Sequence, residues 1–402
     1  MNPIYRSYIP ALLVSVIVSL SCTSRIATGD DKQPLVLAHY MPWYQAKPAS
    51  SIWGWHWTMN KFDPDHLIDG RRAIASHLYP LIGPYDSGDP AVLEYQLLTM
   101  KLAGIDGVII DWYGSQDFLD YGTIHRATQQ LVAMIRRHDM KFAICFENRI
   151  VGKFEEAGRL PASRRVDHVA KEIAWLARHW FTLKNYVRLD GRPVLLGFGQ
   201  KGLTDQEWNR VIQASPVPIA YVSQHYRRPM AVGAFDWPIP AEGMNAIKRF
   251  HASARDWPVS IPVAFPRFKD IYEQAGVHAS WGTIADGNGK TFRDTFRAAI
   301  KSNQRIIQLA TWNDWGEGTS IEPSREYGYR DLETIQSFRR QRLDAKFTFA
   351  TDDLRLPYRL LELRRRIPRG TSSKELDRIA NLISTGELRK AATAIKAASA
   401  RE

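Results

Sequence analysis

Short apolar runs alternate with segments of helical periodicity along most of the chain. The apolar runs predict eight strands, at residues 35–40, 78–82, 107–112, 142–147, 193–198, 219–223, 262–265 and 306–311. Apolar residues at three- and four-residue spacing predict helices at 90–103, 121–138, 165–183, 205–214 and 291–302. This alternation is typical of a parallel sheet, and so many repeats in one unit favour a (β/α)8 TIM barrel over an open sheet.

The first residues have the pattern of a targeting segment. Arg6 precedes an apolar run at residues 9–20, which is shorter than the roughly 20 residues that span a bilayer, and small residues follow it. We interpret residues 1–22 as a secretory signal peptide. The Leu20-Ser21-Cys22 ending resembles a lipoprotein box, so a lipid on Cys22 is an alternative to ordinary cleavage nearby. The protein is therefore expected to be exported, and to be periplasmic, secreted or anchored to the outer membrane through Cys22.

The rest of the chain divides into three parts. Residues 23–34 are expected to form a linker, 35–345 the barrel domain and 346–402 a basic helical C-terminal extension. The chain carries a formal net charge of +12, and residues 351–402 hold 12 Lys+Arg against seven Asp+Glu. This excess indicates either a solvated helix face or a surface that binds polyanions. The sequence contains no recognised nucleic-acid module, so nucleic acid is not an expected partner.

The sequence offers no familiar metal or disulfide motif. Cys145 lies inside an apolar run and is the only cysteine besides Cys22, so we expect a small buried hydrophobe. The absence of CxxC and HExxH leaves a structural zinc site or a zincin-type protease without support. No glycine-rich GxGxxG follows the first predicted strand, which argues against dinucleotide binding. We therefore expect no metal and no cofactor.

Polar and aromatic residues follow the predicted strands at the ends where a (β/α)8 barrel carries its chemistry. Aromatic rings stack on the C–H faces of sugars, and carboxylates bind sugar hydroxyls, so this mixture favours a carbohydrate cleft over a phosphate site. Taken alone, any one of the aromatic residues is better explained as a cap of the barrel core. The predicted sugar contacts are Tyr44, His56, Trp57, Asp86, Trp112, Tyr113, Glu147 and Tyr226.

Asp314 and Glu317 follow the last predicted strand and stand out among these polar residues. Cleavage of a glycosidic bond needs one carboxylic acid and a second carboxylate, about 5–5.5 Å apart in retaining enzymes. Two acidic residues three positions apart on a turn can meet that separation. Trp312 and Trp315 would surround Glu317 with the apolar environment that raises the pKa of an acid catalyst.

Four segments together resemble glycoside hydrolase family 99, the endo-acting α-mannosidases and mannanases, and the 99-like sequences related to it. They are YMPWY at 40–44, GPYDSGDP at 83–90, AGIDG with DWYG between 103 and 114, and WNDWGEGTSIEP at 312–323. The last segment is the most specific. A related domain found with polysaccharide-biosynthesis glycosyltransferases carries a similar pattern there.

The resemblance implies a metal-independent retaining hydrolase that acts inside α-mannose-containing chains. It implies that Glu317 is the general acid/base and that Asp314 deprotonates the neighbouring sugar 2-hydroxyl, which then attacks the anomeric carbon. The sequence departs from the family, which has Glu at 314, His at 316 and a small residue at 111. The shorter side chain of Asp314 withdraws the carboxylate by about 1 Å, a displacement that can cost about 10²-fold in rate.

We therefore expect an exported, monomeric glycosidase that acts on an oligosaccharide or polysaccharide through Asp314 and Glu317. One alternative is a non-catalytic glycan-binding protein on a degenerate barrel, for which the Asp at 314 would mark the lost chemistry. Others are a 99-like domain of polysaccharide biosynthesis and a protein that binds polyanions through its C-terminal extension.

Overall fold

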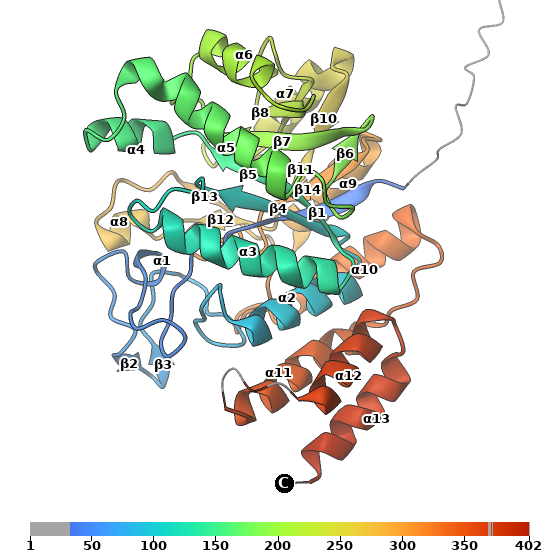
Figure 1. Cartoon of the computed structure of the whole chain (residues 1–402). Coiled ribbons are helices and arrows are strands. Elements are labelled where there is room, and N and C mark those ends of the chain that lie inside the picture. The colour runs from blue at the N-terminus through green and yellow to red at the C-terminus, as the bar shows by residue number, and fades with distance from the viewer. Residues whose placement is uncertain (1–32, 369–370, 372, 402) are drawn as a thin grey trace, which may run out of the picture. The chain divides into compact units, whose positions relative to one another are not determined.

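A computed structural model describes residues 33–368, 371 and 373–401 (Figure 1). The predicted signal peptide and the candidate lipid site at Cys22 lie outside the described residues. Within the described residues, none of the helices combines the length and apolar character needed to cross a bilayer.

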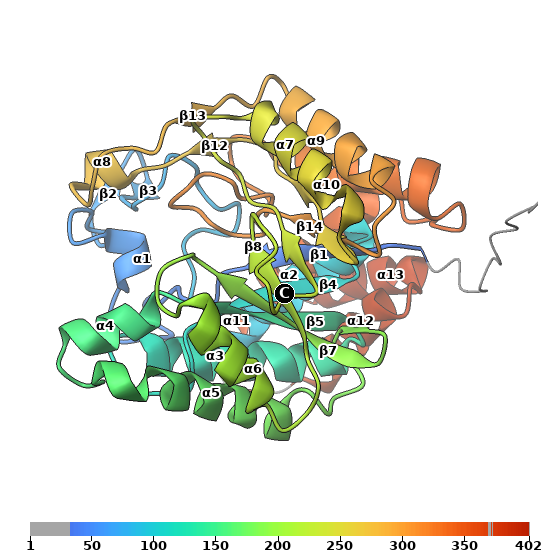
Figure 2. The same cartoon turned by 90° about the horizontal axis from the view of Figure 1, so that it is seen from above.

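The centre of the fold is a parallel sheet that closes on itself (Figure 2). The strands pair in the order β10-β9-β8-β7-β5-β4-β1-β14-β11, and each of these pairs is parallel. Only Pro262 separates β10 from β11, so the two ends of this order belong to one chain segment and the sheet forms a (β/α)8 barrel. The strands are β1 (Leu35–Tyr40), β4 (Gly107–Trp112), β5 (Lys141–Glu147), β7 (Arg192–Phe198), β8 (Ala220–Gln224), β9 (Gly233–Phe235), β10 (Val259–Ile261), β11 (Val263–Ala264) and β14 (Ile306–Leu309).

Helices surround this sheet, and smaller elements lie in the loops (Figures 1 and 2). The outer helices are α2 (Pro90–Ala103), α3 (Tyr121–Arg137), α5 (Arg165–His179), α6 (Asp205–Gln213), α7 (Met244–Ser253), α9 (Lys290–Lys301) and α10 (Arg330–Phe338). The short elements are α1 (Trp55–Thr58), α4 (Ile150–Glu156), α8 (Tyr272–Ala275), β2 (Leu67–Ile68), β3 (Arg71–Arg72), β6 (Arg188–Leu189), β12 (Phe268–Lys269) and β13 (Thr283–Ile284).

Alternating side chains of the barrel strands build two separate core layers. Along β4, Val108, Ile110 and Trp112 join the larger core cluster together with residues of the outer helices. Ile109, between them, belongs to the second cluster with the inward residues of the other strands. Because side chains alternate along a strand, Asp111 shares the inward side with Ile109. This alternation decides which polar residues reach the interior of the barrel.

The predicted strand at residues 78–82 is wrong. This segment forms only an isolated bridge between Pro80 and Ser324 and otherwise runs as a loop. Proline lacks the amide hydrogen that a central strand requires, and the Leu81 amide instead donates to the carbonyl of Pro323 at 2.8 Å. The missing barrel strand is β9, whose three residues are too few to give a clear apolar run.

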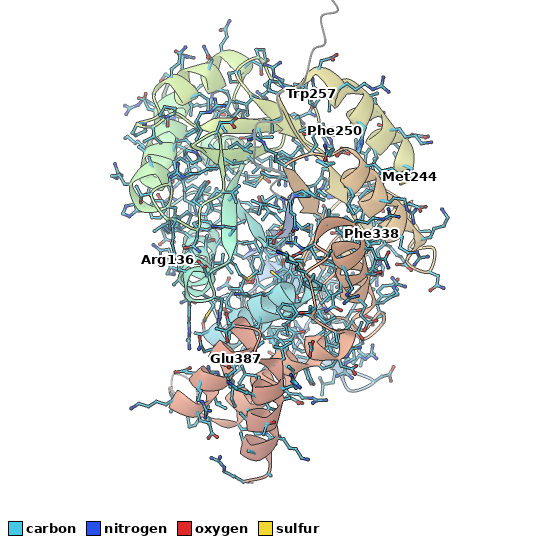
Figure 3. All side chains as sticks on the ribbon, turned by 90° about the vertical axis from the view of Figure 1, so that its right-hand side faces the viewer. Arg136, Met244, Phe250, Trp257, Phe338 and Glu387 are labelled. Atoms are coloured by element: carbon cyan, nitrogen blue, oxygen red, sulfur yellow. The ribbon has the colours of Figure 1, made fainter. Side chains whose placement is uncertain are left out.

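The C-terminal residues form helices α11 (Leu356–Arg366), α12 (Lys374–Ser384) and α13 (Leu388–Ser399) (Figure 1). Helices α11 and α12 pack against α2, and α13 packs against α11 and α12. Figure 3 shows this layer from the side, with Glu387 labelled in it. Leu360 and Ile379 are buried in the contact. Arg364 donates to Glu94 of α2 at 3.0 Å and to Asp377 at 2.7 Å. Buried apolar residues and a charged bridge thus join these helices to the barrel domain.

Candidate active site

Asp314 and Glu317 lie on a tight turn that follows β14. The Asp314 amide donates to the Thr311 hydroxyl at 2.8 Å, and the Glu317 amide donates to Asp314 Oδ1 at 3.0 Å. The first bond holds the backbone of the turn, and the second orients the Asp314 carboxyl group. The exposed fractions of Asp314 and Glu317 are only 3% and 7%. Glu317 Oε2 has no hydrogen-bond partner among the described residues.

A neighbouring loop holds this turn through its backbone. The Lys269 amide donates to the Glu317 carbonyl at 2.9 Å, and the Ile271 amide donates to the Gly316 carbonyl at 3.0 Å. Gly318 makes the approach possible, because its φ is +67° and a Cβ there would lie 2.7 Å from the Lys269 carbonyl oxygen. The two loops therefore form one rigid unit around Glu317.

Burial dominates the electrostatics of the pair. It raises the pKa of Asp314 from 3.8 to about 7. Burial also raises the pKa of Glu317 well above its usual value, and the charge of Asp314 adds to the rise, whereas Arg149 and a hydrogen bond from Tyr272 oppose it. Near neutral pH the pair can thus hold one proton, with Glu317 protonated and Asp314 able to ionise.

The ends of β4 and β5 bring two more carboxyl groups to the site. Asp111 and Glu147 are both buried, with exposed fractions of 4% and 1%. Arg149 donates to both oxygens of Glu147 at 3.2 Å. Burial raises the pKa of Asp111, and the charges of Glu147 and Asp314 add to this rise, which brings Asp111 into the electrostatic neighbourhood of the pair.

Three predicted sugar contacts, Tyr44, Trp57 and Trp112, are buried side chains. Tyr44 is buried, donates to the Asn313 carbonyl at 2.9 Å and accepts from the Trp315 amide at 3.1 Å. Trp57 is fully buried and donates to the Tyr85 carbonyl. In the outer core Trp112 is also fully buried, donates to His125 and packs beside Trp175 and Trp180. In this structure the rings of Trp57 and Trp112 are closed to a ligand.

The remaining predicted contacts lie nearer the surface. His56 stacks on Trp43 with 4.1 Å between ring centroids, and Tyr113 meets the same indole edge-on at 6.4 Å. Tyr226 is 43% exposed. Asp86 accepts from the Ser50 hydroxyl at 2.6 Å and from the Ala46 amide at 3.1 Å, so it orders the loop at 46–50.

A buried hydrogen-bond network supports the turn from within the barrel domain. Glu322 accepts from Tyr85 at 2.7 Å and from Gln96 at 2.8 Å. The Tyr85 oxygen also accepts from the Asn313 amide group at 3.1 Å and from the Trp315 indole at 3.3 Å. Burial raises the pKa of Glu322 to about 8. The polar residues of the last motif therefore divide between the site, at 314 and 317, and its support, at 313 and 322.

Three residues of the site, Tyr272, Arg149 and Asp111, were not among the predicted contacts. Tyr272 lies in α8 and lowers the pKa of Glu317, and Arg149 is the N-cap residue of α4 and donates to Glu147. Tyr272 does not follow a predicted strand directly, so the sequence pattern contains no signal for it. Arg149 lies two residues after the predicted strand at 142–147, so the same strand-end argument could have found it. Asp111 is the residue before the end of a predicted strand, and its inward position follows from the alternation along β4.

Comparison with known proteins places this geometry in context. No family model matches the chain. It is 20% identical over 283 residues to the glycoprotein endo-alpha-1,2-mannosidase-like protein of Danio rerio, with 62% of this chain and 60% of the relative covered. It is 22% identical over 323 residues to the glycoprotein endo-alpha-1,2-mannosidase of Mus musculus, with 71% and 67% covered. The chain thus spans less than two thirds of the Danio rerio relative.

Solved structures give the same picture. Two structures of the GH99 endo-alpha-mannosidase from Bacteroides thetaiotaomicron match with TM-scores of 0.58 and 0.56 and identities of 17% and 18%. They cover 77% and 76% of this chain and 98% and 97% of the solved chains. A glycoside hydrolase-like protein matches with a TM-score of 0.52 and 16% identity, over 76% of this chain and 94% of its own. These likenesses confirm the (β/α)8 fold and the resemblance to glycoside hydrolase family 99.

Proposed function

We propose that the protein is an exported glycoside hydrolase that cleaves α-mannose-containing or related glycans through Asp314 and Glu317. One observation carries the proposal: two buried carboxyl groups share a turn at the carboxyl end of β14, where a (β/α)8 barrel places its catalytic groups. The sequence and structure relatives, which are endo-alpha-mannosidases, support the choice of substrate class. We propose that it acts as a monomer.

The proposed mechanism uses the different protonation of the two groups. Glu317, kept protonated by burial and by the charge of Asp314, donates its proton to the leaving oxygen of the glycosidic bond. Asp314, with a pKa of about 7, ionises near neutral pH and takes the proton of the neighbouring sugar 2-hydroxyl. That oxygen attacks the anomeric carbon as the bond from this carbon to the leaving oxygen breaks, which closes a three-membered ring. Glu317, now a carboxylate, then deprotonates the water that attacks the anomeric carbon, while Asp314 returns its proton to the 2-oxygen, so the ring opens and the product retains its configuration.

Replacing each carboxyl group by its amide tests the assignment. We expect Glu317→Gln and Asp314→Asn to lose at least about 10²-fold in kcat/KM on a panel of α-mannosides, since each removes an acid–base group. The matched control is Glu273→Gln, which changes an exposed carboxyl group of α8 and should keep wild-type activity.

The leaving group separates the two roles. A mannoside whose leaving group needs no protonation, such as a fluoride, should restore cleavage by Glu317→Gln but not by Asp314→Asn. Proton NMR of the first product should show the retained anomer. If wild type cleaves a substrate and both amide variants cleave it equally well, the assignment of the pair is wrong.

The Asp at 314 favours one second candidate, a glycan-binding protein that has lost its chemistry. It predicts that a mannose-containing glycan binds to wild type, while no member of the panel is hydrolysed by wild type. Asp314→Glu then tests whether wild type is inactive only because the Asp314 side chain is too short. If so, the longer side chain should create hydrolytic activity that wild type lacks.

A further inference from the structure

We propose that His39, Asp111 and Cys145 form a binding site for a divalent transition-metal ion of the Zn²⁺ type inside the barrel. One ligand atom from each residue can be chosen so that all three lie within 4.8 Å of one another, and all three residues are buried. This cluster shares no residue with the Asp314–Glu317 pair, although the charge of Asp314 acts on Asp111, and its assignment does not depend on the proposed hydrolase activity.

The barrel topology brings the three residues together. They come from β1, β4 and β5, which are consecutive neighbours in the sheet (Figure 2). Asp111 lies directly opposite Cys145 in the register of β4 and β5, and His39 lies opposite Ile109, one inward position before Asp111. All three side chains therefore point inward on adjacent strands. The backbone positions are fixed by the parallel ladders, so the cluster is preorganised.

Two of the three residues carry buried polar atoms that have no partner. His39 Nε2 and Asp111 Oδ1 form no hydrogen bond among the described residues, although the residues are 0% and 4% exposed. A buried polar atom without a partner costs about 1–3 kcal/mol, a cost that a ligand of both residues would remove. A bound cation would satisfy both atoms at once.

A hydrogen-bond chain holds His39 in the form that binds metals. Gln308 Nε2 donates to the Asp236 carbonyl at 3.1 Å, so the amide must turn its oxygen toward the imidazole. Gln308 Oε1 lies 3.4 Å from His39 Nδ1 and can only accept, so the proton is on Nδ1. The Nε2 lone pair is thus free. Metal-binding histidines commonly have such a partner on the second ring nitrogen.

The donor set selects the type of ion. A neutral imidazole, a carboxylate and a thiolate together carry two negative charges, which balance one divalent cation in a buried site. Nitrogen, oxygen and sulfur donors suit Zn²⁺ or Co²⁺ and disfavour Mg²⁺ and Ca²⁺, which prefer oxygen alone. Tetrahedral Zn²⁺ ligands lie roughly 3.3–3.8 Å apart, so the side chains need to close by about 1 Å. Binding converts the Cys145 thiol to a thiolate and releases its proton.

The test measures metal directly, without any glycan. The full chain carrying Cys22→Ser has Cys145 as its only thiol. We expect about one Zn²⁺ per chain after dialysis against trace Zn²⁺, and a Tm that rises with added Zn²⁺. Replacement by Co²⁺ should produce the near-ultraviolet charge-transfer band of a cobalt–thiolate bond. Absence of that band, or a chain that retains no Zn²⁺ and shows no Tm shift, would overturn the proposal.

Variants locate the ion. Cys145→Ser and His39→Gln should weaken Zn²⁺ binding by more than about 100-fold, and Gln308→Leu, which removes the partner of His39, by roughly 10–100-fold. His138→Gln is the matched control, because His138 is also buried with an unpartnered Nε2 but lies outside the cluster, and it should keep the ion. Equal Zn²⁺ retention by all four variants would refute the site. Should a ligand variant fail to fold, the cobalt spectrum of the Cys22→Ser chain decides alone.

Discussion

Neutralising Asp314 should stabilise the protein at neutral and alkaline pH, even though it removes a proposed catalytic group. Burial raises the pKa of this carboxyl from 3.8 to about 7, so the folded state holds a proton that the unfolded state releases. Stability from this group is therefore complete below about pH 4 and is lost as the pH rises to about 7. The loss amounts to about 4 kcal/mol, from about 1.36 kcal/mol for each pKa unit.

The Asp314→Asn variant cannot ionise and avoids this loss. Its amide oxygen can still accept from the Glu317 amide, the bond that Asp314 Oδ1 makes at 3.0 Å. We expect wild type and variant to have similar free energies of unfolding near pH 4. The variant should then gain progressively and exceed wild type by up to about 4 kcal/mol near pH 8. The variant also removes the Asp314 charge that raises the pKa of Glu317. The pKa of Glu317 therefore rises less on folding, which further increases the stability of the variant relative to wild type at high pH.

Urea unfolding of both proteins at several pH values measures the difference. The control is Asp190→Asn, since Asp190 is exposed and bonds Arg305 at 2.8 Å, and this bond lowers the pKa of Asp190. Relative to wild type, Asp190→Asn should have an unchanged or slightly lower free energy of unfolding as the pH rises. This change has the opposite sign to that expected for Asp314→Asn. Parallel pH curves for wild type and Asp314→Asn would show that Asp314 titrates normally in the fold, and the reasoning about its burial would fail.

Two further predictions concern the support of the fold. Arg364→Ala should lower the free energy of unfolding by about 3–5 kcal/mol in urea titrations, because it leaves the buried Glu94 carboxylate without its partner; a loss below 1 kcal/mol would show that Glu94 does not need it. Gly107→Ala should unfold the protein or prevent its soluble expression, since a Cβ there would lie 2.0 Å from the Lys141 carbonyl oxygen. Its control is Gly152→Ala, where a Cβ meets nothing within 4 Å and the helix should gain up to about 1 kcal/mol. Equal thermal stability of the two alanine variants would contradict the steric argument.

Much of the barrel was predictable from the sequence because its strands are buried on both faces. The predicted bounds 35–40 and 107–112 match β1 and β4 to the residue. The apolar run at 78–82 misled the prediction because its proline cannot join a central ladder. Strand β9 was not predicted, because its three residues give no measurable periodicity.

The site was predictable only where the strand period fixes a side chain. Once Asp111 is placed inward, Trp112 must point outward, so its role as a sugar contact conflicted with the predicted strand itself. The placement of Tyr272 depends on how a loop packs against the turn at 314–317, and no local pattern encodes that contact. The cluster around Cys145 could not be predicted either, because His39 and Asp111 are distant from Cys145 in the sequence and come close to it only across neighbouring strands.

The packing of the C-terminal helices decides how the protein can be shortened. A version ending at residue 345 would expose the face of α2 that α11 and α12 bury. It would also leave the Glu94 carboxylate without the hydrogen bond from Arg364. Newly exposed apolar surface of this kind promotes aggregation during expression. Polyanion binding by this region is therefore better probed by reversing the charge of exposed residues such as Arg359, Arg378 and Arg389, which leaves the covering helices in place.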